Sequence, residues 1–173
     1  MGIKEVIETI NRMQADGVIE RYAIGGAVGA TFYLEPVATL DVDVFVEFHI
    51  PPGSQIVSPE PIFKYLRDHG CKMEAEYVVI AGWPVQFLPA RTALLQEALA
   101  AAVEKDVEGT PARVLTAEHI AAIALETGRA KDKARVLQFI EAGAVDLNRL
   151  REILAHHGLS SAWQQFERQF REQ

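Results

Sequence analysis

Two aspartates, Asp41 and Asp43, are the residues whose type and spacing point most directly to chemistry. They open the run 41–48, in which apolar residues at every second position predict a β-strand. Two residues apart on a strand, both carboxylates project from one face, about 7 Å apart at the backbone. Such a pair among apolar residues repels and loses solvation unless a cation or solvent compensates it. The pair therefore predicts a site for Mg²⁺ (or Mn²⁺) with substrate phosphates; the alternative is two solvated aspartates on an edge strand.

A glycine pair, Gly25-Gly26, lies upstream, between a predicted strand over 18–24 and a predicted helix over 27–34. The first turn of a helix presents unpaired backbone N–H groups and a partial positive charge. Glycines allow a phosphate to approach that backbone closely. The pair therefore predicts a phosphate-binding turn, although glycine pairs also occur at turns that bind nothing.

The two motifs together resemble the signature of the DNA-polymerase-β-like nucleotidyltransferase superfamily. They read Tyr-Ala-Ile-Gly-Gly over 22–26 and Thr-Leu-Asp-Val-Asp-Val over 39–44. The resemblance implies that Gly25 and Gly26 position a nucleoside triphosphate (NTP) and that Asp41 and Asp43 hold Mg²⁺. It also implies an α+β fold, in which a mixed sheet flanked by helices is followed by a C-terminal helical bundle.

A basic cluster over 129–135 extends the resemblance. The stretch from 115 to 135 looks like the helical segment of bacterial nucleotidyltransferases similar to the AbiEii toxins, in which a Gly-Arg-x-Lys-Asp sequence joins two helices. Arg129, Lys131, Lys133 and Arg135 fall within seven residues, offset by Asp132. In an acidic protein such a cluster favours one local anionic ligand, so Arg129, Lys131 and Lys133 are predicted to bind the nucleotide. The alternative is a solvated helix face.

Gln86 departs from the superfamily pattern. It lies on the predicted strand 84–88, where relatives supply a third carboxylate that acts as general base or metal ligand. A glutamine amide forms hydrogen bonds but takes up no proton at neutral pH. Glu74 and Glu76 are possible substitutes, expected to share one face of a strand over 72–80. Residues 123–127 also lack the lysine that toxin-like relatives carry, so the two departures favour binding of a metal-nucleotide over fast transfer.

The remaining sequence predicts a mixed α/β part over 1–115 and a helical part over 116–173. Helical periodicity and capping residues place helices between the strands and throughout the second part. The predicted helices are 3–15, 58–69, 91–102, 116–127, 130–142, 146–158 and one that Ser160 or Ser161 caps. The predicted strands also include hairpins of 72–80 with 84–88 and of 103–107 with 112–115.

Composition limits the partners. The chain has 173 residues and a formal net charge of -7, so broad binding to the nucleic-acid backbone is not expected. No stretch approaches the ~20 apolar residues of a membrane span, and one cysteine, Cys71, excludes an internal disulfide; a cytoplasmic location is expected. The five histidines lack the spacing of a metalloprotease, so no zinc site is expected, and His156-His157 should complement a helix end.

Two functional hypotheses follow. The first is a metal-dependent nucleotidyltransferase that uses an NTP and an unknown hydroxyl acceptor, with Asp41, Asp43 and Gln86 as catalytic candidates. The second is a catalytically weak or inactive module of the same fold that binds nucleotide or a protein partner, as in a toxin–antitoxin pair. A dinucleotide-binding interpretation fails because Ile24 occupies the position of the first glycine in Gly-x-Gly-x-x-Gly.

Overall fold

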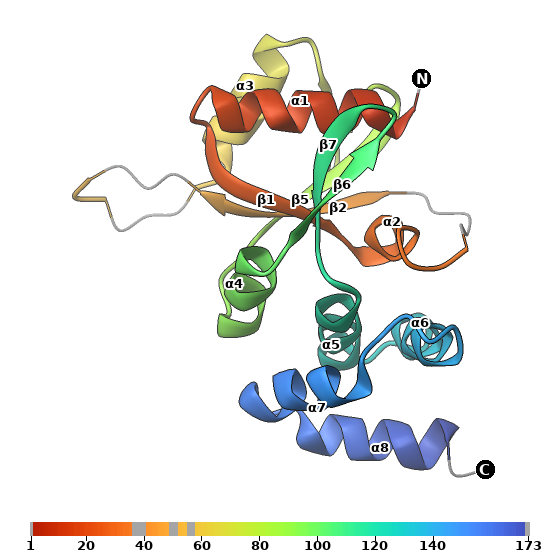
Figure 1. Ribbon diagram of the computed structural model, residues 1–173. Helices are drawn as coiled ribbons and strands as arrows, with labels where there is room; N and C mark the ends of the chain where they lie inside the picture. The colour runs from red at the N-terminus through yellow and green to blue at the C-terminus, as the bar shows by residue number, and fades with distance from the viewer. Residues whose placement is uncertain (1, 36–40, 49–51, 55–57, 172–173) are drawn as a thin grey trace.

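A computed structural model describes residues 2–35, 41–48, 52–54 and 58–171 of the chain. Eight helices and seven strands are found in these ranges (Figure 1). The helices are α1 (Ile3–Ala15), α2 (Gly26–Ala30), α3 (Glu60–Asp68), α4 (Ala93–Ala100), α5 (Ala117–Thr127), α6 (Ala130–Glu141), α7 (Leu147–His156) and α8 (Ser160–Phe170). The strands are β1 (Ile19–Gly25), β2 (Val42–Phe48), β3 (Lys72–Glu74), β4 (Tyr77–Ile80), β5 (Trp83–Pro89), β6 (Val103–Val107) and β7 (Thr110–Val114).

The strands form one mixed sheet in the order β3-β4-β5-β2-β1-β7-β6. β2 pairs antiparallel with β1 and parallel with β5, and β1 pairs parallel with β7. The predicted mixed sheet with flanking helices is therefore confirmed. Because β2 has a partner on each side, the alternative of an edge strand for the aspartates is wrong.

The alternation in β2 separates two hydrophobic cores. Val42, Val44 and Val46 are fully buried and belong to the core that α1 and α3 cover. Phe45 points to the opposite face and belongs to the core formed with α4 and the C-terminal helices. Figure 1 shows these two layers above and below the sheet. Since Asp43 has the parity of Phe45, its carboxylate lies on the face toward the C-terminal helices.

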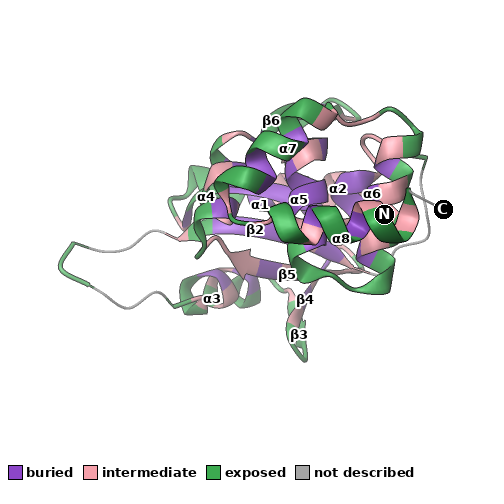
Figure 2. Ribbon diagram, turned by 90° about the horizontal axis from the view of Figure 1, so that it is seen from below, coloured by how far each residue is buried: buried purple, intermediate pink, exposed green. Residues whose placement is uncertain are grey.

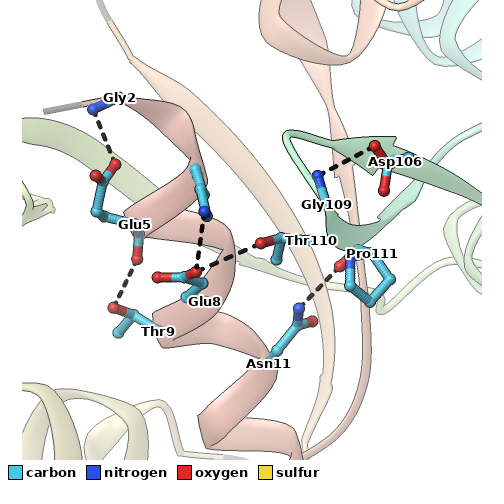
Figure 3. Close-up of polar contacts among 10 residues, drawn as sticks. Gly2, Glu5, Glu8, Thr9, Asn11, Asp106, Gly109, Thr110 and Pro111 are labelled. Atoms are coloured by element: carbon cyan, nitrogen blue, oxygen red, sulfur yellow. Dashed lines mark hydrogen bonds and ion pairs between the residues drawn. The ribbon is translucent and has the colours of Figure 1, made fainter.

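Helix α1 is attached to the β6–β7 hairpin by polar contacts (Figure 3). The Asn11 side-chain amide donates to the Pro111 carbonyl oxygen at 2.8 Å, and the Thr110 hydroxyl donates to Glu8 at 3.4 Å. The Asn11 side-chain oxygen also accepts from the Tyr22 hydroxyl at 2.7 Å. Tyr22 lies in β1, so these bonds connect α1, the hairpin and the strand that ends at Gly25.

The C-terminal helices pack around α5, whose inner face is buried (Figure 2). The Thr116 hydroxyl caps α5 by accepting from the His119 backbone N–H at 3.2 Å. Gly128 ends the helix in the left-handed conformation, at φ 71°. The predicted helical region after 115 is thus confirmed, while the division into parts 1–115 and 116–173 stays a prediction.

Several boundaries differ from expectation. The expected strand over 72–80 is two strands, β3 and β4, because the chain turns at Ala75, which has a positive φ of 55°. α2 ends at Ala30 and continues only as turns, and α3 starts at Glu60. Leu159 rather than a serine precedes α8, so its N-cap side chain makes no hydrogen bond. Within the described ranges, no helix combines the length and apolar character needed to cross a membrane.

Candidate active site

Gly25, Asp43 and Gln86 lie in one row across three neighbouring strands. Asp43 is the register partner of Gly25 in β1 and of Gln86 in β5. Register partners project to the same face of a sheet, so the Gln86 amide lies beside the Asp43 carboxylate. The sheet thus brings together three residues of which the first and last, Gly25 and Gln86, are 61 positions apart in the chain.

Gly26 packs directly against the Asp43 carboxylate. It has φ 59°, and a Cβ atom at this position would lie 2.3 Å from Asp43 Oδ2. At Gly25, a Cβ atom would lie 2.6 Å from the Phe45 ring. Neither position accepts a side chain without displacing its neighbour, and one of the neighbours is a candidate metal ligand. Gly26 therefore does more than form a turn, because its backbone lies against the Asp43 carboxylate.

Asp43 is in an environment that disfavours its charge. Burial, the neighbouring Asp41 charge and a hydrogen bond between the two carboxyl groups raise its pKa from 3.8 to about 6, against the positive charges of Arg135 and Arg129. The Asp41 charge also raises the pKa of Tyr77, which places that phenol near the pair. Asp41 directly precedes β2, its charge acts on Asp43, and a divalent cation would relieve the repulsion between the two carboxyl groups.

A cavity of about 240 Å³ lies between this face of the sheet and helices α5 and α6. Asp43 lines it from β2, Gly26 lines it from the start of α2, and Arg129 and Arg135 line it from α6 and its N-terminus. Leucine, isoleucine and phenylalanine side chains form much of the remaining wall. The other lining residues are Phe45, Leu88, Leu95, Leu115, Ile120, Ile123, Ala124, Glu126, Thr127 and Asp132.

The two cavity arginines share one buried partner, Asp132. Its residue exposure is only 2%, and its carboxylate accepts from Arg129 Nε at 2.7 Å and lies 3.7 Å from Arg135 Nη1. Arg129 is the N-cap of α6, and Asp132 and Arg135 follow at three-residue intervals on one face of the helix. Asp132 therefore positions both guanidinium groups at the cavity.

The basic residues of 129–135 separate into two sets. Lys131 is exposed, and Lys133 Nζ donates to Gln169 of α8 at 3.4 Å. Neither lysine is among the described residues that line the cavity, whereas Arg129 is. Arg135 was missing from the predicted nucleotide ligands. Its three-residue spacing from Asp132 is the signal in the sequence that would have included it.

The candidate substitutes for a third carboxylate lie elsewhere. Glu74 ends β3 and Glu76 lies in the following turn, so the expectation that they share one face of a strand is wrong. Glu47 forms an ion pair with Arg21 of β1. Glu126, in the last turn of α5, does line the cavity and was not considered as a catalytic group.

Comparison with known proteins identifies the fold. No protein-family model and no curated protein matches this sequence. The solution structure of the antibiotic-resistance factor ANT(2'')-Ia is similar, with a TM-score of 0.57, 14% identity and 96% of each chain covered. Its crystal structure in complex with adenylyl-2''-tobramycin gives 0.57, 14% identity, and 90% and 96% coverage. An antigenic nucleotidyltransferase-like protein from Paracoccidioides brasiliensis gives 0.58, 14% identity, and 94% and 92% coverage.

These similarities extend over nearly the whole of each chain, and they show that the fold is that of the nucleotidyltransferases. The fold implied by the two short motifs is thereby confirmed. The narrower likeness to AbiEii-type toxins is not among these findings and stays a prediction.

Proposed function

We propose that the protein is a metal-dependent nucleotidyltransferase that moves a nucleotide from an NTP to a hydroxyl acceptor. The observation that carries the proposal is the position of Asp43. It lies against Gly26, beside Gln86, and on the same cavity as two arginines held by a buried aspartate. The nucleotidyltransferase fold supports this assignment.

The carboxylate pair fits a divalent cation. The Asp43 pKa of about 6 reflects burial first and repulsion from the Asp41 charge second. Mg²⁺ (or Mn²⁺) prefers one or two carboxylates together with substrate phosphates. When bound, such an ion neutralises the charge that develops on the phosphates. Asp41 and Asp43 would hold it.

The phosphates would lie between the glycine turn and the arginines. Gly26 presents backbone without a side chain to the cavity, and guanidinium groups bind phosphate oxygens through paired N–H donors. Asp132 keeps Arg129 and Arg135 oriented before the nucleotide arrives, which lowers the entropic cost of binding. In this proposal Arg135 takes the role first predicted for Lys131 and Lys133.

In the proposed transfer, the acceptor oxygen bonds to the α-phosphorus, the bond to pyrophosphate breaks, and the hydroxyl proton passes to a base. Gln86 cannot take that proton at neutral pH. Asp132 is engaged by two arginines, which leaves Glu126 as the remaining carboxylate among the described cavity residues. We assign the proton to Glu126 and expect Glu126→Gln to slow transfer by about 10²-fold or more while nucleotide binding is kept.

Incubation with labelled NTPs and Mg²⁺ tests the proposal. Tobramycin is a suitable first acceptor because the ANT(2'')-Ia crystal structure contains its adenylyl derivative. Cell extract supplies other small-molecule, protein and RNA hydroxyls. Label should appear on an acceptor with the native protein and be lost in the double variant Asp41→Asn/Asp43→Asn. Equal labelling by that variant would overturn the mechanism.

A second candidate function is a nucleotide-binding module with weak or no transfer activity, such as one half of a toxin–antitoxin pair. The amide of Gln86 beside Asp43 favours it, since a carboxylate is expected there. Calorimetry with Mg-ATP and Mg-CTP separates the two functions. Nucleotide binding without any labelled acceptor supports the module, and labelling that depends on Asp43 supports the enzyme.

A further inference from the structure

A second cluster of ligating side chains lies outside the Asp43 cavity, where α4 meets the end of α7. Glu97, His156 and His157 each offer one ligand atom, and these atoms all lie within 4.8 Å of one another. A separate hollow of about 440 Å³ is lined by Glu97 and His156, and none of its described lining residues belongs to the Asp43 cavity. The two sites are therefore independent.

His157 has a buried nitrogen that no hydrogen bond satisfies. Its side chain is 7% exposed, and its Nε2 lies 3.2 Å from Glu97 Oε2 without the direction of a hydrogen bond. Within the described part of the chain this nitrogen has no hydrogen-bond partner of good geometry, although, against the effect of burial, it and His119 lie close enough to Glu97 to lower the pKa of that carboxyl. A buried polar atom left in this way costs free energy, and a bound cation is one means of satisfying it. The nitrogen is therefore the strongest indication of a missing ligand.

The Glu97 carboxylate also contacts a third histidine, His119. His119, buried in α5 and 2% exposed, has Nε2 2.9 Å from Glu97 Oε2. The Thr116 hydroxyl lies 2.7 Å from the other ring nitrogen of His119. Supporting hydrogen bonds of this kind fix the orientation of ligating groups in metal sites. Thr116, His119 and Glu97 thus form a chain that holds the carboxylate toward the two histidines.

We propose that Glu97, His156 and His157 bind a zinc-type divalent transition metal, with His119 as a positioning residue. Two imidazoles and a carboxylate are a ligand set that suits Zn²⁺ and leaves a fourth position for water. The same set disfavours Mg²⁺, which binds oxygen ligands. The expectation that the histidines form no zinc site was based on spacing along the chain. It missed Glu97 because that ligand lies 59 residues before His156.

The site would join parts of the chain that are distant in sequence. Glu97 comes from α4, ahead of the β6–β7 hairpin, and the histidines come from the end of α7. A metal that binds only the folded state stabilises it by an amount that grows with the logarithm of the free metal concentration once this exceeds the Kd. The thermal midpoint should therefore rise as Zn²⁺ is added. Arg149 lines the same hollow, and its positive charge opposes that of the metal.

Zinc titration of untagged, chelator-treated protein tests the site. Calorimetry should detect a Zn²⁺ equivalent that Asp43→Asn keeps, and in Asp43→Asn the melting temperature should rise with Zn²⁺ but not with the same concentration of Mg²⁺. His156→Ala, at an exposed position, and His157→Gln should each weaken Zn²⁺ affinity by at least about tenfold. His69→Ala, a histidine on α3's C-terminal cap, is the matched control and should bind as the native protein does.

Asp43→Asn separates this site from the proposed active site, because it should keep the zinc response in full. Absence of Zn²⁺ binding to the native protein would overturn the proposal. So would a response that survives in both His156→Ala and His157→Gln, or one that is lost in Asp43→Asn. Failure of nucleotidyl transfer in any assay leaves the zinc measurement unaffected.

Discussion

Gln86 lies directly beside Asp43, as its register partner in the parallel pairing of β5 with β2. The amide therefore occupies the position from which a carboxylate would reach the same metal or the same acceptor proton. The two residues share a face of the sheet, and the remaining cavity wall carries Arg129 and Arg135. In the proposed mechanism, this pairing means that Asp43 has an amide rather than a third carboxylate beside it.

Replacing Gln86 by aspartate should increase transfer. Gln86→Asp adds a proton acceptor or metal ligand beside Asp43, and a general base contributes about 10²–10⁴-fold in rate. Repulsion from two neighbouring aspartates reduces the gain, so an increase of about tenfold or more is expected. The initial rate of labelled-nucleotide incorporation measures it. Asparagine has the same length as aspartate without the charge, so Gln86→Asn should give no increase in rate. An equal gain in both variants would show that the added carboxylate is not the cause.

Asp43 should make the folded state less stable as pH rises. Its pKa is about 6 in the folded protein against 3.8 in the unfolded reference, so the folded state binds the proton more tightly. This contribution is present below pH 4 and is lost as pH rises through about 6. In the absence of metal, Asp43→Asn should therefore stabilise the protein at pH 7 by about 1–2 kcal/mol, a value reduced for partial solvent exposure.

Chemical denaturation at pH 4 and pH 7 measures this difference, which should shrink toward zero at pH 4. Protons also compete with metal, so Mn²⁺ affinity of the native protein should fall below about pH 6. A stability difference that grows toward acid pH would show that the sign is wrong.

A methyl group at Gly26 should disturb the aspartate as well as the backbone. Gly26→Ala places Cβ 2.3 Å from Asp43 Oδ2, at a φ of 59°. Gly17→Ala is a matched control, because Gly17 has φ 78° and nothing within 4 Å of its Cβ position. Both should lose about 1–2 kcal/mol from the left-handed conformation. Only Gly26→Ala should also weaken Mn²⁺ binding; equal Mn²⁺ affinity in the two variants would contradict the contact.

Arg135 and Lys131, both in α6, should differ in how much they contribute to nucleotide affinity. Arg135→Ala removes a cavity guanidinium and leaves Asp132 with one fewer partner, so Mg-NTP affinity should fall by about tenfold or more. Lys131→Ala removes an exposed charge outside the cavity and should change affinity by less than about threefold. Calorimetry with a non-hydrolysable NTP compares them. A larger loss in Lys131→Ala would restore the assignment made from sequence.

Residues close together in the chain gave the most reliable predictions. The alternation over 41–48 predicted β2, and the Thr116 cap and Gly128 predicted both ends of α5, because each signal acts within one element. The turn at Ala75 was missed, since no glycine or proline marks it and residues 72–80 look like one strand. Local propensity does not resolve two short strands from one long strand when the turn residue is an ordinary one.

The sequence by itself predicted most helices and strands, the resemblance to the nucleotidyltransferase fold, and Asp41 and Asp43 as candidate site residues. Alternation and spacing along the chain are enough to show which side chains share a face. Only the tertiary structure decided which of the basic residues meet that pair. Four basic residues fall within seven positions of the sequence. The packing of α6 places Arg129 and Arg135 at the cavity and Lys133 beside α8. The same holds for Glu97 and the histidines, whose contact depends on how α4 and α7 pack and on no local pattern. The sequence states the chemistry of each side chain. Contact between distant segments arises only when the folded chain buries their apolar faces together.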